Sequence, residues 1–73
     1  MKDHFREELK KYVAYNLSCA RNYCNTYKEV LDHQAISYGA VQFFINACPN
    51  EYEAISSWWD EQKMKFQEIA DKK

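Results

Sequence analysis

The sequence predicts an all-α fold, a small three-helix bundle that runs up, down and up. One Gly and one Pro in 73 residues leave few breakers for strands and tight turns. Apolar residues recur three and four positions apart along most of the chain, without a sustained period of two. We therefore expect a single helical domain over residues 1–73, with helices at 3–23, 27–47 and 50–70. Such similar lengths and short connections are typical of antiparallel bundles.

Each expected helix carries a stripe of apolar and small residues that would lie on one side of it. Polar Asn16 falls within the first stripe. The first stripe comprises Phe5, Leu9, Tyr12, Val13, Ala20, Tyr23, Cys24 and Tyr27; the second comprises Tyr27, Val30, Leu31, Tyr38, Val41 and Ile45; the third comprises Tyr52, Ile55, Trp59, Phe66 and Ile69.

The boundary near Thr26 separates the bundle from an alternative fold. The first two stripes stay in phase from Phe5 to Ile45, so periodicity also permits one long helix followed by two shorter helices that pack in a dimer. Thr26 and Glu29, however, have the spacing of a capping box, which starts a new helix. Asn22 and Asn25 could adopt the left-handed conformation that ends the preceding one. These signals favour separate helices.

The second boundary is marked by Pro49. Proline removes a backbone donor and does not continue a helix. Asn50, followed three residues later by Glu53, is a suitable N-cap for the third helix. We therefore expect a break at Pro49 and a capped helix after it.

Composition disfavours several function classes. Ten basic and eleven acidic residues give a net charge of −1, so no overall field attracts the chain to nucleic acid or to anionic membranes. No apolar run approaches the roughly 18 residues that span a bilayer, and the first residues lack the apolar run of a signal peptide. Three cysteines without a CxxC pair suit a reducing compartment. We expect a cytoplasmic protein without a membrane segment.

The sequence offers no pattern for a metal, a cofactor or a catalytic site. Zinc-like spacing is absent from the potential ligands Cys19, Cys24, Cys48, His4 and His33. Neither a glycine-rich phosphate loop nor a nucleophile motif occurs. Acidic pairs lie beside lysines at helical spacing, which is typical of a solvated face. We expect neither a metal nor a cofactor, and no enzymatic activity.

One basic stripe supports an alternative function. Lys2, Arg6 and Lys10 fall on one side of the first helix at four-residue spacing, as phosphate contacts would. Acidic residues interleave with them, and no helix-turn-helix signature accompanies them. A nucleic-acid-associated accessory or regulatory factor is therefore the second candidate.

Two pairs of adjacent aromatics, Phe43-Phe44 and Trp58-Trp59, indicate a surface for a partner. Neighbours on a helix point about 100° apart, so one core cannot bury both members of each pair. Relative to the expected core, Trp58 and Phe43 point outward and Phe44 lies at the edge. Alternatively, lysine stems could cover these rings.

The expected function is a protein–protein interaction module that self-associates. A second copy is the commonest way to cover an apolar patch, because symmetric dimers dominate among oligomers. Gly39 and Ala40 would let another backbone approach closely, whether that of the third helix or of another chain. The predicted interface comprises Phe43, Phe44, Trp58, Tyr15 and Met64, and a homodimer is the expected assembly.

Overall fold

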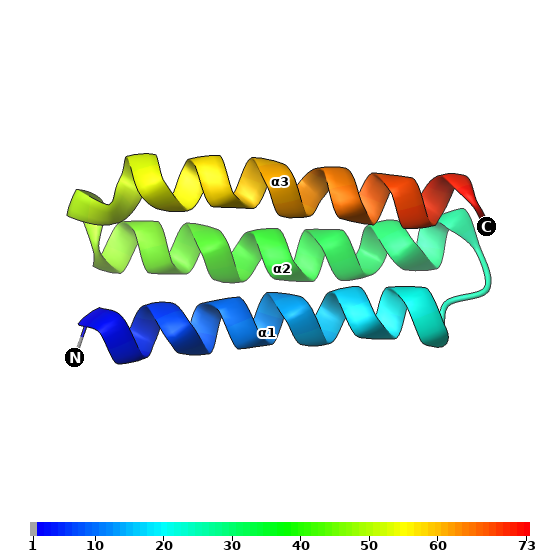
Figure 1. The fold of residues 1–73 in the computed structure, drawn as a ribbon, viewed down its shortest axis with the longest axis horizontal. Coiled ribbons are helices and arrows are strands. Elements are labelled where there is room, and N and C mark those ends of the chain that lie inside the picture. The colour runs from blue at the N-terminus through cyan, green and yellow to red at the C-terminus, as the bar shows by residue number, and fades with distance from the viewer. Residues whose placement is uncertain (1) are drawn as a thin grey trace.

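The chain folds as three antiparallel helices that lie side by side (Figure 1). The computed structural model describes residues 2–73, and side chains from residue 3 onward. α2 packs against both α1 and α3, which also contact each other. The elements are α1 (Lys2–Asn22), α2 (Tyr27–Ala47), a short 3₁₀ helix η1 (Pro49–Glu51) and α3 (Tyr52–Asp71). The predicted three-helix bundle is confirmed.

The capping box at Thr26 begins α2 as predicted. Thr26 is extended (φ −130°, ψ 158°), and its Oγ1 accepts a hydrogen bond from the backbone N–H of Glu29 at 3.2 Å. The Thr26 hydroxyl in turn donates to Glu29 Oε1 at 3.1 Å. The alternative of one long helix is therefore wrong.

The left-handed conformation expected at Asn22 and Asn25 does not occur, so this prediction is also wrong. No residue other than glycine among residues 2–73 has a positive φ. α1 instead closes with hydrogen bonds from the backbone N–H groups of Tyr23 and Cys24 to the carbonyl of Cys19, at 2.8 and 3.2 Å. Two donors on one carbonyl satisfy the helix end without a left-handed turn.

Replacing Thr26 by alanine is expected to lower the free energy of unfolding by about 1 kcal/mol, because the N–H of Glu29 loses its acceptor. Urea denaturation followed by circular dichroism measures the change. Thr26→Ser keeps the oxygen and should remain close to wild type. Equal losses in both variants would show that the hydroxyl has no capping role.

Pro49 ends the helical run as predicted, but the cap expected at Asn50 is wrong. Pro49 opens η1, and Asn50 lies inside that turn rather than before a helix. α3 follows Glu51, which makes no side-chain capping bond. The proline starts helical backbone at residue 49, one residue earlier than the sequence indicated, because its fixed φ suits a first helical position.

The core is drawn from all three helices at three- and four-residue spacing. The stripe of α3 is largely confirmed. That of α1 is confirmed only in part, because its aromatic members Phe5, Tyr12, Tyr23 and Tyr27 are exposed, and α2 is rotated so that Phe44, not Tyr38, lies inward. α2 packs against two neighbours, and its core direction lies between them. The buried apolar residues are Leu9, Val13, Leu17, Ala20, Cys24, Val30, Val41, Phe44, Ile55, Trp59, Phe66 and Ala70.

Three polar side chains are buried among these residues, namely Asn16, Ser37 and Gln62. Asn16 Nδ2 donates to the carbonyl of Tyr12 at 3.1 Å, and Asn16 Oδ1 lies 2.8 Å from His33 Nδ1. Ser37 is fully buried, and its hydroxyl has no hydrogen-bond partner among the described residues. An unpaired buried hydroxyl opposes folding.

Ser37→Ala is therefore expected to raise the free energy of unfolding by about 1 kcal/mol, because it removes an unsatisfied group and improves helix propensity. Ser57 in α3 is exposed, so Ser57→Ala reports the propensity gain alone. Equilibrium unfolding in urea compares the two variants. A gain at Ser37 no larger than that at Ser57 would contradict the burial argument.

Candidate interaction surface

Phe44 is a core residue rather than an exposed one. It is 1% exposed, and its ring meets that of Phe5 edge to face, with centroids 5.3 Å apart. The rotation of α2 places Phe44 in the core, so the sequence-based assignment of this residue to an exposed patch is wrong.

Trp58 and Met64, two further residues of the predicted interface, lie on α3. Trp58 is half-buried, packs against the core and has Lys10 Nζ 5.9 Å from its ring centroid. The ammonium group of Lys10, from α1, thus lies over the ring, so a lysine covers part of Trp58, as in the alternative considered. Met64 is 64% exposed.

Phe43 and Tyr15, the members of the predicted interface on α2 and α1, are also exposed, at 67% and 65%. Phe43 lines an apolar groove of about 240 Å³ between α1 and α2. Tyr15 follows Tyr12, another lining residue, by three positions, so both occupy the same side of α1. The groove is lined by Phe5, Glu8, Leu9, Tyr12, Ala40, Phe43 and Phe44.

The groove lies within a larger apolar surface. Ile36 is 50% exposed and precedes Ala40 and Phe43 by four and seven residues, which places it on the same side of α2. We call this surface the α1/α2 face, and it comprises Phe5, Tyr12, Tyr15, Ile36, Ala40 and Phe43. Sequence reasoning missed Phe5, Tyr12 and Ile36 as surface residues because it placed the first two in the core stripe and did not consider the third.

Most of α2 lacks charge. Residues 33–50 contain no Asp, Glu, Lys or Arg, whereas the longest uncharged run within α1 or α3 covers only residues 12–20. The groove includes one charged residue, Glu8, whose carboxylate lies 3.5 Å from Lys11 Nζ. A helix that is apolar on more than one side is normally covered on more than one side. This uncharged run is the sequence signal that could have located the surface.

Gly39 lies on the exposed part of α2, beside Ala40. A Cβ added there would meet no heavy atom within 4 Å among the described residues. Packing within one copy therefore does not require glycine at this position. The sequence left open whether the backbone that approaches Gly39 is that of the third helix or of another chain. Since no atom lies near, α3 is not the close neighbour.

The basic stripe on α1 is engaged within the molecule. Arg6 donates to Glu51 Oε1 at 2.7 Å and also lies 3.7 Å from Asp3, and these carboxylates raise the pKa of Arg6, mainly through the hydrogen bond to Glu51. Lys10 covers Trp58, as described above. The side chain of Lys2 lies outside the described part of the structure. Arg6 and Lys10 thus face η1 and α3, and the charge of Arg6 is paired with carboxylates.

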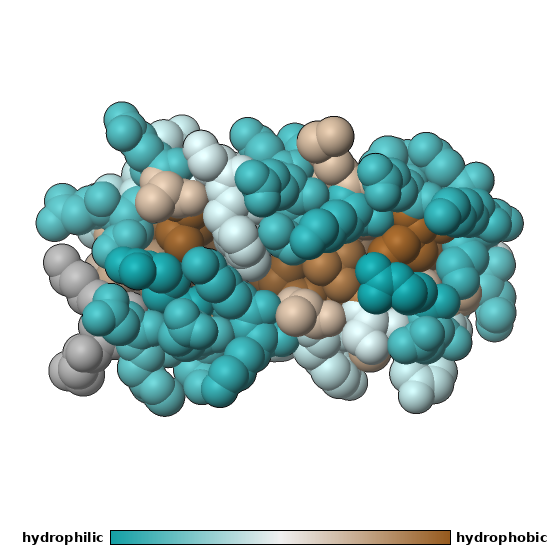
Figure 2. Space-filling view, viewed as in Figure 1, coloured by the Kyte–Doolittle hydropathy of each residue, from teal (hydrophilic) through white to brown (hydrophobic). Residues whose placement is uncertain are grey.

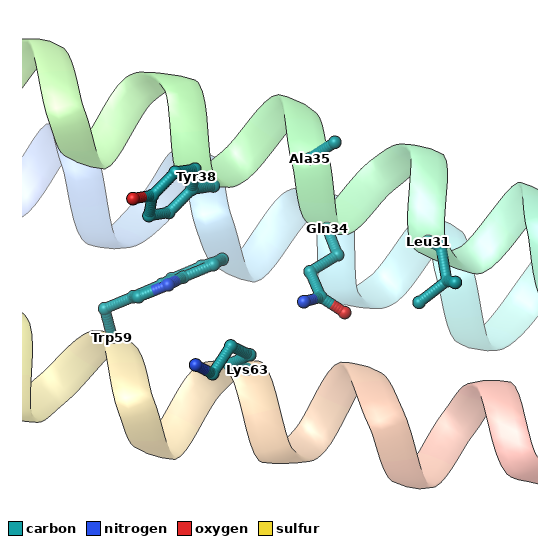
Figure 3. A pocket seen from close by; sticks show the side chains of 6 residues that line it. All are labelled: Leu31, Gln34, Ala35, Tyr38, Trp59 and Lys63. Carbon is teal, nitrogen blue, oxygen red and sulfur yellow. The ribbon is translucent and has the colours of Figure 1, made fainter.

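A second hollow lies between α2 and α3, with a volume of about 440 Å³ (Figure 3). Trp59 forms one side, with its ring centroid 5.9 Å from that of Tyr38, and the Gln34 carboxamide extends from α2 toward α3. Lys63 stands at its rim, 4.0 Å from Asp60. This hollow is more polar than the α1/α2 groove. Polar side chains also dominate the side of the molecule seen in Figure 2, where apolar atoms form an interrupted band.

Metal ligands do not gather in the part of the chain that the structure describes: no three His, Cys, Asp or Glu side chains lie close enough to hold an ion. Cys19, Cys24 and Cys48 are free thiols. Burial, aided by the nearby charge of Glu29, raises the pKa of Cys24 and keeps its thiol neutral.

Among residues 2–73, no helix has the length and hydrophobicity needed to cross a membrane. Comparison of the chain with known protein families, curated proteins and solved structures gives no match. Functional assignment therefore depends on the chemistry of the surface.

Proposed function

We propose that this chain is a protein–protein interaction module that self-associates as a homodimer through the α1/α2 face. The observation that carries the proposal is the exposed Phe43 beside an apolar groove, on a helix without charge from residue 33 onward. Large exposed apolar groups clustered in this way mark a surface that another molecule covers.

The free energy available from covering this face is substantial. A Phe or Ile side chain that passes from full exposure to full burial contributes roughly 1.5–3 kcal/mol. In one copy Phe43 keeps most of its surface exposed to solvent and Ile36 keeps half. Tyr12 adds further exposed aromatic surface. For a chain of 73 residues, whose own stability is of the order of 5–15 kcal/mol, such a contribution matters.

A second copy is the partner that suits a neutral surface. In a two-fold dimer each residue near the axis faces its own counterpart, so a charge there would repel itself. The uncharged run of α2 avoids this repulsion. A partner recognised by opposite charge would require charged groups on the face, and Glu8 is already paired with Lys11.

The compartment we propose is the cytoplasm, where thiols are kept reduced. Free Cys19 and Cys48 are both partly exposed, and a reducing environment would prevent their cross-linking. The nucleic-acid function is the weaker candidate, because Arg6 is hydrogen-bonded to Glu51 and Lys10 lies over Trp58.

Dilution of ¹⁵N-labelled protein over a hundredfold concentration range tests the proposal by NMR. We expect concentration-dependent shifts of backbone amides to concentrate on α1 and α2 around Tyr12, Ile36 and Phe43. Amides on the outer side of α3, such as that of Met64, serve as the internal control. Shifts centred on the hollow at Trp59 would contradict the assignment of the face, and spectra that do not change with concentration would contradict self-association.

A further inference from the structure

We infer, on the basis of the proposed function, that the two copies of α2 cross antiparallel about a two-fold axis between Gly39 and Ala40. In this arrangement Ile36 of each copy packs against Phe43 of the other, and the small residues meet at the centre.

The first argument is the order of side-chain sizes along the exposed side of α2. Ile36, Gly39, Ala40 and Phe43 occupy positions i, i+3, i+4 and i+7, which share one side of a helix. The sizes read large, small, small, large, and they read the same in reverse. Two antiparallel copies centred on this run therefore place a large residue opposite a large one and a small residue opposite a small one. Such a pattern is self-complementary.

The second argument is the unexplained glycine. Glycine within a helix costs about 1 kcal/mol relative to alanine. No atom of this copy occupies the space where its Cβ would stand. Absence of a side chain at Gly39 lets the backbones of two helices approach closely, which gives the residue a role that one copy alone does not supply.

The third argument is the distribution of charge along α2. Its three charged residues, Lys28, Glu29 and Asp32, are confined to the first two turns. A parallel pair would set the acidic groups of one copy beside the same groups of the other, which is unfavourable. An antiparallel pair separates them to opposite ends, next to the uncharged end of the partner's α2. Charge therefore selects the antiparallel orientation.

The size of the molecule sets how far the contact extends. The bundle measures 36 by 18 by 14 Å between Cα atoms. A long side of these dimensions offers roughly 500–650 Å² per copy, or of the order of 1,000–1,300 Å² in a dimer, which is at the lower limit of stable interfaces. The contact must therefore continue from α2 onto the aromatic edge of α1, where Phe5 and Tyr12 lie.

Gly39→Leu separates two effects of the glycine, its low helix propensity and the close approach of helices that it allows. Leucine has the higher helix propensity, so the variant should denature at a higher urea concentration than wild type when both are monomeric. The same side chain blocks the crossing and should weaken association at least tenfold. Ala54→Leu, at an exposed position of α3 away from the α1/α2 face, is the matched control and should leave association unchanged. Unweakened association of Gly39→Leu would overturn the crossing.

Cysteine cross-linking tests the register. In a Cys19→Ser, Cys48→Ser background, which retains only the buried Cys24, Gly39→Cys should form an intermolecular disulfide on mild oxidation, because residues at the axis lie within bonding reach. Ala35→Cys should not. A dimer in sedimentation that fails to cross-link at residue 39 would overturn the crossing and leave the proposed function intact. A chain that is monomeric at every concentration would overturn both.

Discussion

Phe44→Ala is expected to lower the free energy of unfolding by about 3–5 kcal/mol, the largest effect of any single change considered. The ring is 1% exposed and meets Phe5 edge to face within the core. Truncation removes its burial and leaves a cavity that the helices cannot fully close. A loss of this size is a large part of the stability of a small protein.

Phe43→Ala is the matched control, because it removes the same atoms one residue away from a 67% exposed position. At concentrations where the protein is monomeric, we expect it to change the free energy of unfolding by less than about 0.5 kcal/mol. Urea unfolding monitored by circular dichroism compares the two. Equal losses from both variants would show that α2 is rotated differently from the orientation described.

Phe43→Asp is expected to weaken self-association about a hundredfold while leaving the helices intact, a change of about 2.7 kcal/mol in binding free energy. The substitution removes the largest exposed apolar group of the α1/α2 face. It also introduces a carboxylate that must lose its hydration in the contact. Size-exclusion chromatography with light scattering, at a fixed concentration, measures the loss of dimer.

Met64→Asp is the control for this prediction. Met64 is 64% exposed, close to the value for Phe43, but it lies on α3. Its replacement introduces the same charge and should leave association unchanged. Were Met64→Asp to dissociate the protein as strongly as Phe43→Asp, the contact would involve α3 rather than the α1/α2 face.

Local chemistry made the course of the chain predictable. The Thr26 cap and the Pro49 break each act through backbone hydrogen bonds within a few residues, so sequence spacing was sufficient to find them. The cap at Asn50 failed because the 3₁₀ turn depends on how Pro49 enters α3, which spacing does not show.

The orientation of α2 was not predictable to the same degree. This helix is apolar on several sides, so a stripe through Tyr38 and one through Phe44 are similar in hydrophobicity. Contacts with both α1 and α3 decide between them, and these contacts are tertiary. Phe44 was therefore assigned to the surface although it is buried.

The candidate surface was predicted only in part, through Phe43 and Tyr15. Trp58 was misleading because Lys10, on a different helix, covers its ring. Which residues of α1 belong to the surface depends on which edge of this helix lies against α2. The apolar stripe alone did not indicate that Phe5 and Tyr12 would stay 40% and 43% exposed. The absence of charge between residues 33 and 50 was the more reliable signal.

Sedimentation equilibrium of the wild-type chain over a hundredfold concentration range is the most direct test of whether the α1/α2 face binds a second copy. The weight-average mass should rise from that of one chain toward that of two as concentration increases, and Phe43→Asp should remove the rise. A mass equal to one chain at every concentration would contradict the account.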